Sequence, residues 1–142
     1  LIVSLDVCIN KMNYQRLPFI VAKFFRLGVW EFDLLHIAPF GRAWENRDVM
    51  LYDLRKLYPY LKKTLEFSEE NNINIWTNRL PSQYLEGFED KIQDPYKLHS
   101  EIDGQKEMMN KYLFSGKDLE CSGERCSYCY MRFFCEKLKK WK

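Results

Sequence analysis

The sequence lacks any run of about eighteen apolar residues, which is the length that a transmembrane helix needs. Its most apolar stretch, residues 17–30, is interrupted by Lys23 and Arg26. The start of the chain also lacks the basic segment and the long apolar core of a signal peptide. These absences argue against a membrane partner and predict a cytoplasmic protein.

A strong net charge is missing as well, because 22 Lys and Arg residues nearly balance 20 Asp and Glu residues. A net charge of +2 gives no field that would draw the whole chain toward nucleic acid, so we expect no nucleic-acid partner. Apolar residues make up 46% of the chain and charged residues 30%, which is the balance of an ordinary globular domain. A length of 142 residues is enough for one domain with a core and a small appendage.

What the chain has is a concentration of cysteine near its end, in residues 117–142, called here the cysteine segment. Four of the five cysteines follow the spacing C-x4-C-x2-C-x5-C, and they are Cys121, Cys126, Cys129 and Cys135. A reducing compartment keeps thiols available, which favours metal binding over disulfides. Four thiolates from one short segment can form a cage for zinc or for an iron–sulfur cluster.

The spacing favours iron–sulfur without excluding zinc or plain thiols. The arrangement C-x4-C-x2-C of the first three cysteines occurs in plant-type ferredoxins. Zinc cages more often use two tight pairs, whereas only Cys126 and Cys129 form such a pair here. His99 could complete a mixed site, although it lies well upstream. The alternative function is therefore a non-catalytic α/β module in which a structural zinc site of four cysteines supports partner binding.

The first half of the chain predicts an α/β fold of the order strand–helix–strand–helix–strand. Segments rich in β-branched and apolar residues predict buried parallel strands at residues 1–7, 29–37 and 73–77. Helical spacing predicts helices over 18–27 and 48–57, with a new start at Pro59, and further helices over 82–89 and 101–114. We expect three parts: residues 1–81, a helical connector over 82–116, and the cysteine segment, which docks through Phe133, Phe134 and Trp141.

Several polar residues near the predicted strands allow two interpretations each. Asp6 and Asp33 lie on strands, where either a polar ligand inside a barrel or a salt bridge would account for them. His36 could face a site or be a buried, hydrogen-bonded histidine, and Cys8 could line a site at a strand end or fill space. Arg42 could bind a carboxylate or phosphate, or lie on the surface.

Three stretches of the chain resemble the radical S-adenosylmethionine (radical SAM) enzymes. Residues 3–13 resemble the fifth strand and turn of that family, residues 25–43 resemble the sixth strand, and residues 72–81 resemble the strand that follows. The cysteine segment resembles the auxiliary-cluster segments of the SPASM and twitch type. The resemblance implies the C-terminal part of a partial (β/α) TIM-like barrel that carries an auxiliary [4Fe-4S] cluster on the four clustered cysteines.

The resemblance further implies which residues lie near S-adenosylmethionine or substrate: Asn10, Pro39, Gly41 and Arg42. The family's C-x3-C-x2-C loop, which cleaves S-adenosylmethionine, is absent from these 142 residues. Because the first residues read as the interior of a strand, we expect a missing N-terminal barrel half, without which the chain is not catalytically competent. A ferredoxin or flavodoxin would be the electron donor.

Overall fold

A parallel three-stranded sheet forms the centre of the fold. The computed structural model describes residues 2–93, 107–118 and 123–140. The strands β1 (Ser4–Ile9), β2 (Glu31–His36) and β3 (Asn74–Asn78) are neighbours in the order of the sequence, and both pairings are parallel. The α/β class and all three strands are thus as the sequence predicts, although β1 begins later than expected and extends to Ile9.

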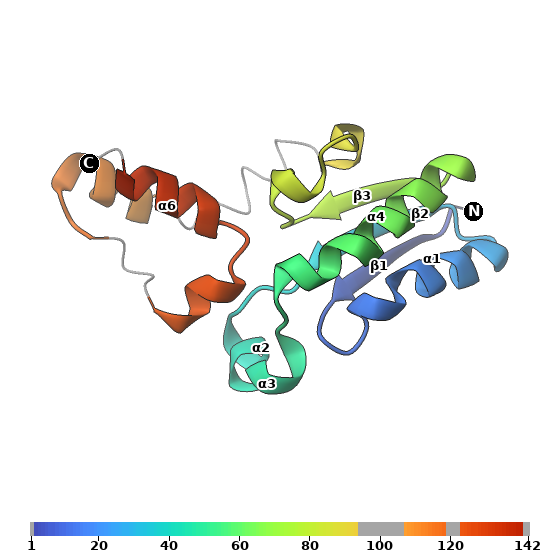
Figure 1. The fold of residues 1–142 in the computed structure, drawn as a ribbon, viewed down its shortest axis with the longest axis horizontal. Coiled ribbons are helices and arrows are strands. Elements are labelled where there is room, and N and C mark those ends of the chain that lie inside the picture. Colours follow the sequence, from blue (N-terminus) through green and yellow to red (C-terminus); the bar gives the residue numbers. More distant parts are fainter. Residues whose placement is uncertain (1, 94–106, 119–122, 141–142) are drawn as a thin grey trace.

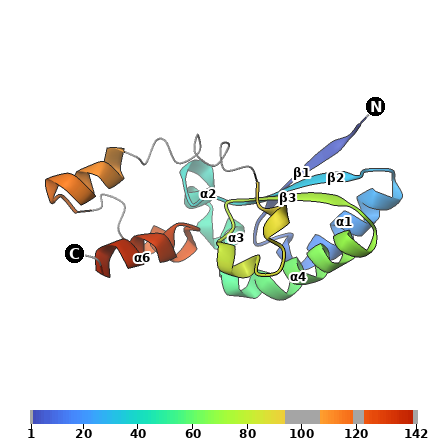
Figure 2. The same ribbon diagram turned by 90° about the horizontal axis from the view of Figure 1, so that it is seen from above.

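Two long helices cover one face of this sheet (Figure 2). The helix α1 (Leu17–Arg26) follows a 3-10 turn, η1 (Tyr14–Arg16), and the helix α4 (Leu54–Glu70) precedes β3. Pro18 lies in the first turn of α1, where its missing N–H costs little. Gly28 then ends the helix with a φ of +92°, a conformation that glycine adopts without strain. Both helix boundaries agree with the sequence prediction.

The region between β2 and β3 differs from the prediction of one helix that restarts at Pro59. Two short helices, α2 (Gly41–Glu45) and α3 (Arg47–Met50), precede an extended break, and α4 begins at Leu54 with Pro59 inside it. The reason for this start is Asp53, whose side chain accepts a hydrogen bond from the backbone N–H of Arg55 at 3.0 Å. A carboxylate at this capping position stabilises a helix start by about 1 kcal/mol.

The helix-covered face of the sheet carries the main apolar core. Strand register places Val7, Leu34 and Thr77 in one row, while Phe32 and Ile75 belong to the row before it. These side chains are buried against apolar residues of the two helices, which are Leu17, Val21, Leu54, Leu57, Leu61 and Leu65. We call this unit, residues 2–93, the sheet layer.

The opposite face of the sheet is largely polar, and no helix of the described residues covers it (Figure 2). Register places two rows of side chains there: Ser4, Glu31 and Asn74, then Asp6, Asp33 and Trp76. Asp6 and Asn74 are exposed, and Trp76 is 36% exposed. We call this surface the polar face of the sheet.

The two edges of the sheet differ. Beyond β3, the predicted helix over 82–89 is replaced by two 3-10 turns, η2 (Ser82–Tyr84) and η3 (Glu89–Lys91). The chain then returns to β3, since Ile92 forms a parallel bridge with Thr77 and the backbone N–H of Gln93 donates to the Thr77 carbonyl at 3.2 Å. The outer edge of β1 has no strand partner among the described residues.

The C-terminal part lies beside the carboxyl end of the strands (Figure 1). It contains a helix over residues 107–115, a 3-10 turn η4 (Glu124–Tyr128) and the helix α6 (Arg132–Lys140). The first of these confirms the predicted helix for residues 107–114, whereas 101–106 lie outside the described residues. Tyr112 and Leu138 are the buried members of its apolar cluster, and Met131 is buried as well.

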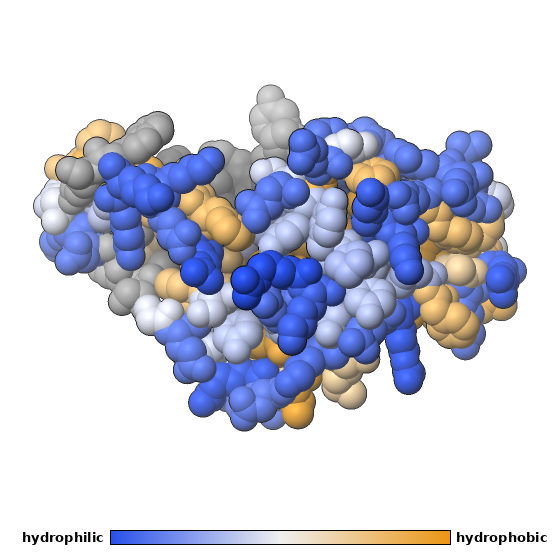
Figure 3. Space-filling model, in the orientation of Figure 1, coloured by the Kyte–Doolittle hydropathy of each residue, from blue (hydrophilic) through white to orange (hydrophobic). Residues whose placement is uncertain are grey.

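The surface seen in Figure 3 is mostly hydrophilic, with apolar atoms gathered over the end of α1. Leu27, which directly follows α1, is 70% exposed, and Phe19 in the first turn of α1 is 65% exposed. No helix within the described ranges is both long enough and apolar enough to cross a membrane.

Candidate functional site

Consecutive backbone turns position the described cysteines of the cysteine segment. The N–H of Cys126 donates to Gly123, that of Cys129 donates to Cys126, and that of Arg132 donates to Cys129, at 3.1 to 3.3 Å. Gly123 begins this series with a φ of +104°. Cys135 follows in α6, where its N–H donates to the Met131 carbonyl at 3.0 Å. Cys126 and Cys129 therefore bracket a single tight turn.

The four predicted metal ligands are placed only in part. Cys121 and the alternative ligand His99 lie outside the described residues. Among the residues that are described, no three His, Cys, Asp or Glu side chains lie close enough together to hold a metal ion. The structure thus brings Cys126 and Cys129 to one turn without gathering Cys135 into a three-ligand group with them.

His36 links the cysteine turn to the sheet layer. It stands at the end of β2, is 1% exposed, and its Nε2 lies 3.1 Å from the backbone carbonyl of Tyr128. Its Nδ1 lies 2.8 Å from the hydroxyl of Tyr52. Because a carbonyl only accepts hydrogen bonds, Nε2 carries the proton and Nδ1 accepts from the Tyr52 hydroxyl. This contact joins residues that are 92 positions apart in the sequence.

Burial keeps this histidine neutral. Desolvation lowers the pKa of His36 to about 4, opposed by its hydrogen bond to Tyr128 and aided by the positive charge of Arg79. Burial also raises the pKa of Tyr52 above its ordinary value, so its hydroxyl keeps the proton that it donates. Of the two sequence interpretations of His36, the buried and hydrogen-bonded one is correct.

Two further contacts hold the cysteine segment against the sheet layer. The guanidinium of Arg125, in the cysteine segment, lies 4.8 Å from the centre of the Trp44 ring of α2. The guanidinium of Arg47, which belongs to the sheet layer, lies 5.1 Å from the same ring centre. Tyr128 packs against the main core. The predicted anchors Phe133 and Phe134 are 38% and 49% exposed, and both line a cavity together with Leu80 of the sheet layer. Trp141, the third predicted anchor, lies outside the described residues.

The predicted cofactor-binding residues lie at the carboxyl edge of the sheet. Asn10 follows β1, while Pro39, Gly41 and Arg42 follow the neighbouring β2. The Asn10 side chain is used locally, because its Nδ2 donates to the Cys8 carbonyl at 3.0 Å and its Oδ1 accepts from the N–H of Met12 at 2.9 Å. Pro39 is buried, Gly41 opens α2 with a φ of +52°, and Arg42 is exposed on that helix.

The polar face of the sheet contains a buried polar pair that sequence reasoning found only in part. Gln93, 5% exposed, donates from Nε2 to Oδ2 of Asp33, 9% exposed, at 3.3 Å. The Gln93 Oε1 is buried without a hydrogen-bond partner. Cys8 belongs to the same face, and its partial burial raises its thiol pKa, an effect that Arg79 opposes. The Asp33 carboxylate is thus stabilised by a hydrogen bond from the Gln93 amide.

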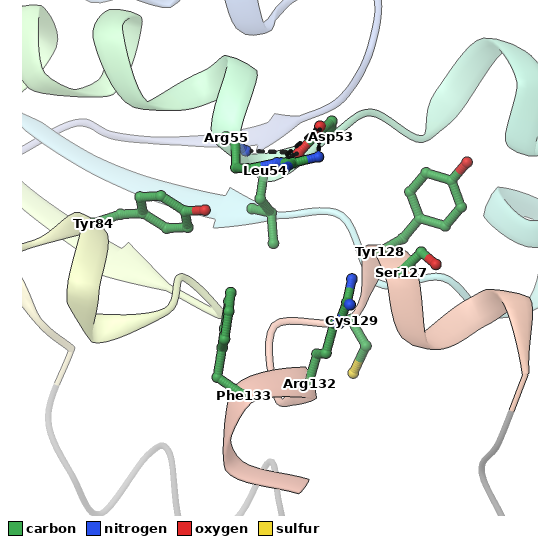
Figure 4. A pocket seen from close by; sticks show the side chains of 9 residues that line it. All are labelled: Asp53, Leu54, Arg55, Tyr84, Ser127, Tyr128, Cys129, Arg132 and Phe133. Carbon is green, nitrogen blue, oxygen red and sulfur yellow. Dashed lines mark hydrogen bonds and ion pairs between the residues drawn. The ribbon is translucent and has the colours of Figure 1, made fainter. Parts of the chain in front are cut away.

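A cavity of about 450 Å³ separates the cysteine turn from the start of α4 (Figure 4). Arg132 of α6 points into it toward the side where Asp53 and Arg55 lie, and Tyr84 and Tyr128 flank it. Sequence reasoning missed this cavity and its two arginines.

Comparisons with known protein families, with curated proteins and with solved structures find no match.

Proposed function

We propose that this chain is the C-terminal part of a radical SAM iron–sulfur enzyme, in which it closes a partial (β/α) barrel and carries an auxiliary [4Fe-4S] cluster. The observation that supports this most is the one-sided sheet: three parallel strands in sequence order, with α1 and α4 on the same face. Doubly wound α/β folds place helices on both faces, whereas a (β/α) barrel places them all outside.

The polar face of the sheet fits the inside of such a barrel. Its rows carry Asp6, Asp33 and Glu31, which a purely structural sheet packed against apolar residues would not tolerate. Asp33 is already buried and hydrogen-bonded by Gln93. Polar side chains on this face would contact a polar substrate or S-adenosylmethionine, together with residues at the carboxyl edge near Asn10 and Arg42.

The open edge of β1 supports the proposal of a further barrel half. A parallel strand at this edge would form hydrogen bonds with the backbone groups of β1 that have no strand partner in the described part of the chain. We propose that the N-terminal barrel half, with the loop that cleaves S-adenosylmethionine, pairs along this edge. The other edge is covered by Ile92 and Gln93, which fits an open rather than a closed barrel.

The donor chemistry of the cysteine segment supports a metal, but its described geometry is incomplete. Thiolates are the ligands that iron–sulfur clusters use, and Cys126 and Cys129 share one turn. The described cysteines do not yet form a three-ligand group. The proposal therefore requires the segment to rearrange around the cluster, with Cys121 and Cys135 completing the set. Four protein thiolates would leave no iron of the cluster open to substrate. The cluster would therefore either stabilise the segment or transfer electrons that it receives from a ferredoxin or flavodoxin in the cytoplasm.

Metal analysis of anaerobically purified protein tests this proposal. We expect a brown protein that absorbs light at about 400 nm, as proteins with iron–sulfur clusters do. Cys126→Ser and Cys129→Ser should each lose iron and sulfide, because they remove ligands from the shared turn. Cys8→Ser is the matched control, since Cys8 lies on β1 and is not a proposed ligand, and it should keep full metal content.

Two results would contradict the iron–sulfur assignment. Colourless protein with one zinc per chain, lost in the same two variants, would favour the alternative of a four-cysteine zinc module that binds a partner. Metal content that is unchanged in both variants, or no bound metal in the parent protein, would remove the proposed site altogether.

A further inference from the structure

The cavity between the start of α4 and the cysteine turn has the composition of a binding site for a small organic anion. Its volume of about 450 Å³ lies within the range of ligand pockets, which is about 300 to 1,000 Å³. Aromatic and apolar side chains form much of its wall: Leu54, Tyr84, Tyr128 and Phe133. Flat aromatic walls favour a flat aromatic occupant, because stacked and edge-to-face ring pairs add to simple burial.

Two arginines face the cavity, and each is paired with one carboxylate. The charged lining side chains are Asp53, Arg55 and Arg132. Arg55 is paired with Asp53 through its Nε and Nη2, at 2.8 to 3.2 Å. Arg132 is paired through its Nε with Glu136, one turn further along α6, at 2.7 Å.

Arg132 has donors left to bind an anion. Its Nε donates to Glu136 at 2.7 Å, and no hydrogen bond of its two Nη atoms is found among the described residues. The Glu136 hydrogen bond raises the pKa of Arg132, whereas the nearby positive charge of Arg55 opposes this rise. Since Nε of Arg132 is held by Glu136, the Nη atoms are the part of the guanidinium that can bind an anion in the cavity. Figure 4 shows the Arg132 side chain directed toward the Asp53–Arg55 pair.

We propose that this cavity binds a small aromatic carboxylic acid, with the carboxylate on the Nη atoms of Arg132 and the ring between Tyr84, Tyr128 and Phe133. One planar guanidinium matches one carboxylate in size and geometry. Because both arginines of the cavity are already paired with carboxylates, a monoanion is favoured over a phosphate dianion. Cys129, a proposed metal ligand, also lines the cavity, but the proposed contacts to the occupant come from the other lining side chains.

Three indoles of equal ring size test this proposal by calorimetry and by NMR shift mapping on the full 142-residue chain. Indole-3-acetate is an anion, indole-3-ethanol is neutral and tryptamine is a cation. We expect saturable binding of indole-3-acetate with a Kd on the order of 1 mM or below. Indole-3-ethanol should bind at least about tenfold more weakly, and tryptamine should not bind, because each lacks the carboxylate that pairs with Arg132.

Variants of the lining residues sharpen the test. Arg132→Gln should weaken indole-3-acetate binding at least about tenfold, and Arg132→Lys should fall between it and the parent protein. Asp53→Asn should tighten binding, since it removes the only negative charge of the lining while asparagine still caps α4. Arg26→Gln, on the exposed end of α1, is the control and should change nothing.

Equal affinity for the anion and the alcohol would overturn the proposal, as would full affinity in the Arg132→Gln variant. The absence of saturable indole-3-acetate binding up to about 10 mM would overturn it too, because a preformed cavity with a charge partner should reach that affinity. Loss of metal in the Cys126→Ser variant with retained indole-3-acetate binding would separate this site from the proposed cluster.

Discussion

The sheet layer and the C-terminal part differ most in how much apolar surface they bury. Among the described residues, eighteen buried apolar side chains form one core around the sheet, whereas the cluster of the C-terminal part has two buried members, Tyr112 and Leu138. A unit with so small a core needs other sources of stability, such as a bound metal or contacts with a larger neighbour. His36 and Trp44 supply two such contacts with the larger neighbour.

This difference has a functional consequence under the proposed function. Strands and long helices hold the polar face of the sheet in a fixed geometry, as a substrate-facing surface requires. The cysteine segment is held by a few contacts at one end of the sheet, so metal binding can reshape it without disturbing the main core.

The largest expected contrast comes from matched leucine deletions. Leu61 of α4 is fully buried in the main core, and Leu138 of α6 is 9% exposed in the small cluster. Leu61→Ala should lower the free energy of unfolding of the sheet layer by about 3 kcal/mol, through lost burial and a residual cavity. Leu138→Ala should leave that transition almost unchanged. Urea denaturation followed by tryptophan fluorescence measures both, and equal effects would contradict the division into two units.

Acidification should weaken the contact between the two regions. Since burial lowers the pKa of His36 to about 4 from an ordinary value of 6.5, the unfolded chain binds a proton between these values that the folded chain does not. The free energy of unfolding should therefore rise with pH from about 4 to about 6.5 and then level off. The full amplitude from this residue is about 3 kcal/mol.

His36→Gln is the comparison variant, because an amide can still donate to the Tyr128 carbonyl but does not titrate. Its unfolding free energy should lack the rise between pH 4 and 6.5 that we assign to His36. The protection factors of the turn from Cys126 to Cys129, which are corrected for the pH dependence of intrinsic exchange, should fall on acidification in the parent protein and much less in the variant. The same pH dependence in both proteins would show that His36 is not the group responsible.

Local sequence patterns were enough to predict the strands and the first helix. The β-branched residues near Val7 and Ile75, and the Pro18 and Gly28 boundaries of α1, act through their immediate neighbours, which is why they could be read from sequence. The predicted start of α4 at Pro59 was wrong, because Asp53 caps the helix and lets it begin at Leu54. The turns after Ser82 were mistaken for a helix, since short polar stretches do not distinguish 3-10 turns from α-helix.

The anchors of the cysteine segment could not be predicted in this way. The contact between His36 and Tyr128, and the stacking of Arg125 on Trp44, depend on how distant parts of the chain come together. Neither pair has a spacing signal. The concentration of cysteines was visible from the start, because metal ligands often cluster in sequence, but their distances in space are a tertiary property. The polar strand residue Asp33 was a recognisable signal, whereas its partner Gln93 was not.

The smallest expected effect is the difference between substitutions of two arginines that contact the Trp44 ring. Arg125 and Arg47 both lie over Trp44, at 4.8 and 5.1 Å, but only Arg125 belongs to the cysteine segment. Arg125→Ala should therefore loosen that segment by about 1 kcal/mol, the usual size of such a contact. Arg47→Ala removes a similar contact within the sheet layer and should leave the segment unchanged. Hydrogen exchange over residues 123–132 measures the difference, and equal protection in the two variants would mean that Arg125 does not anchor the segment.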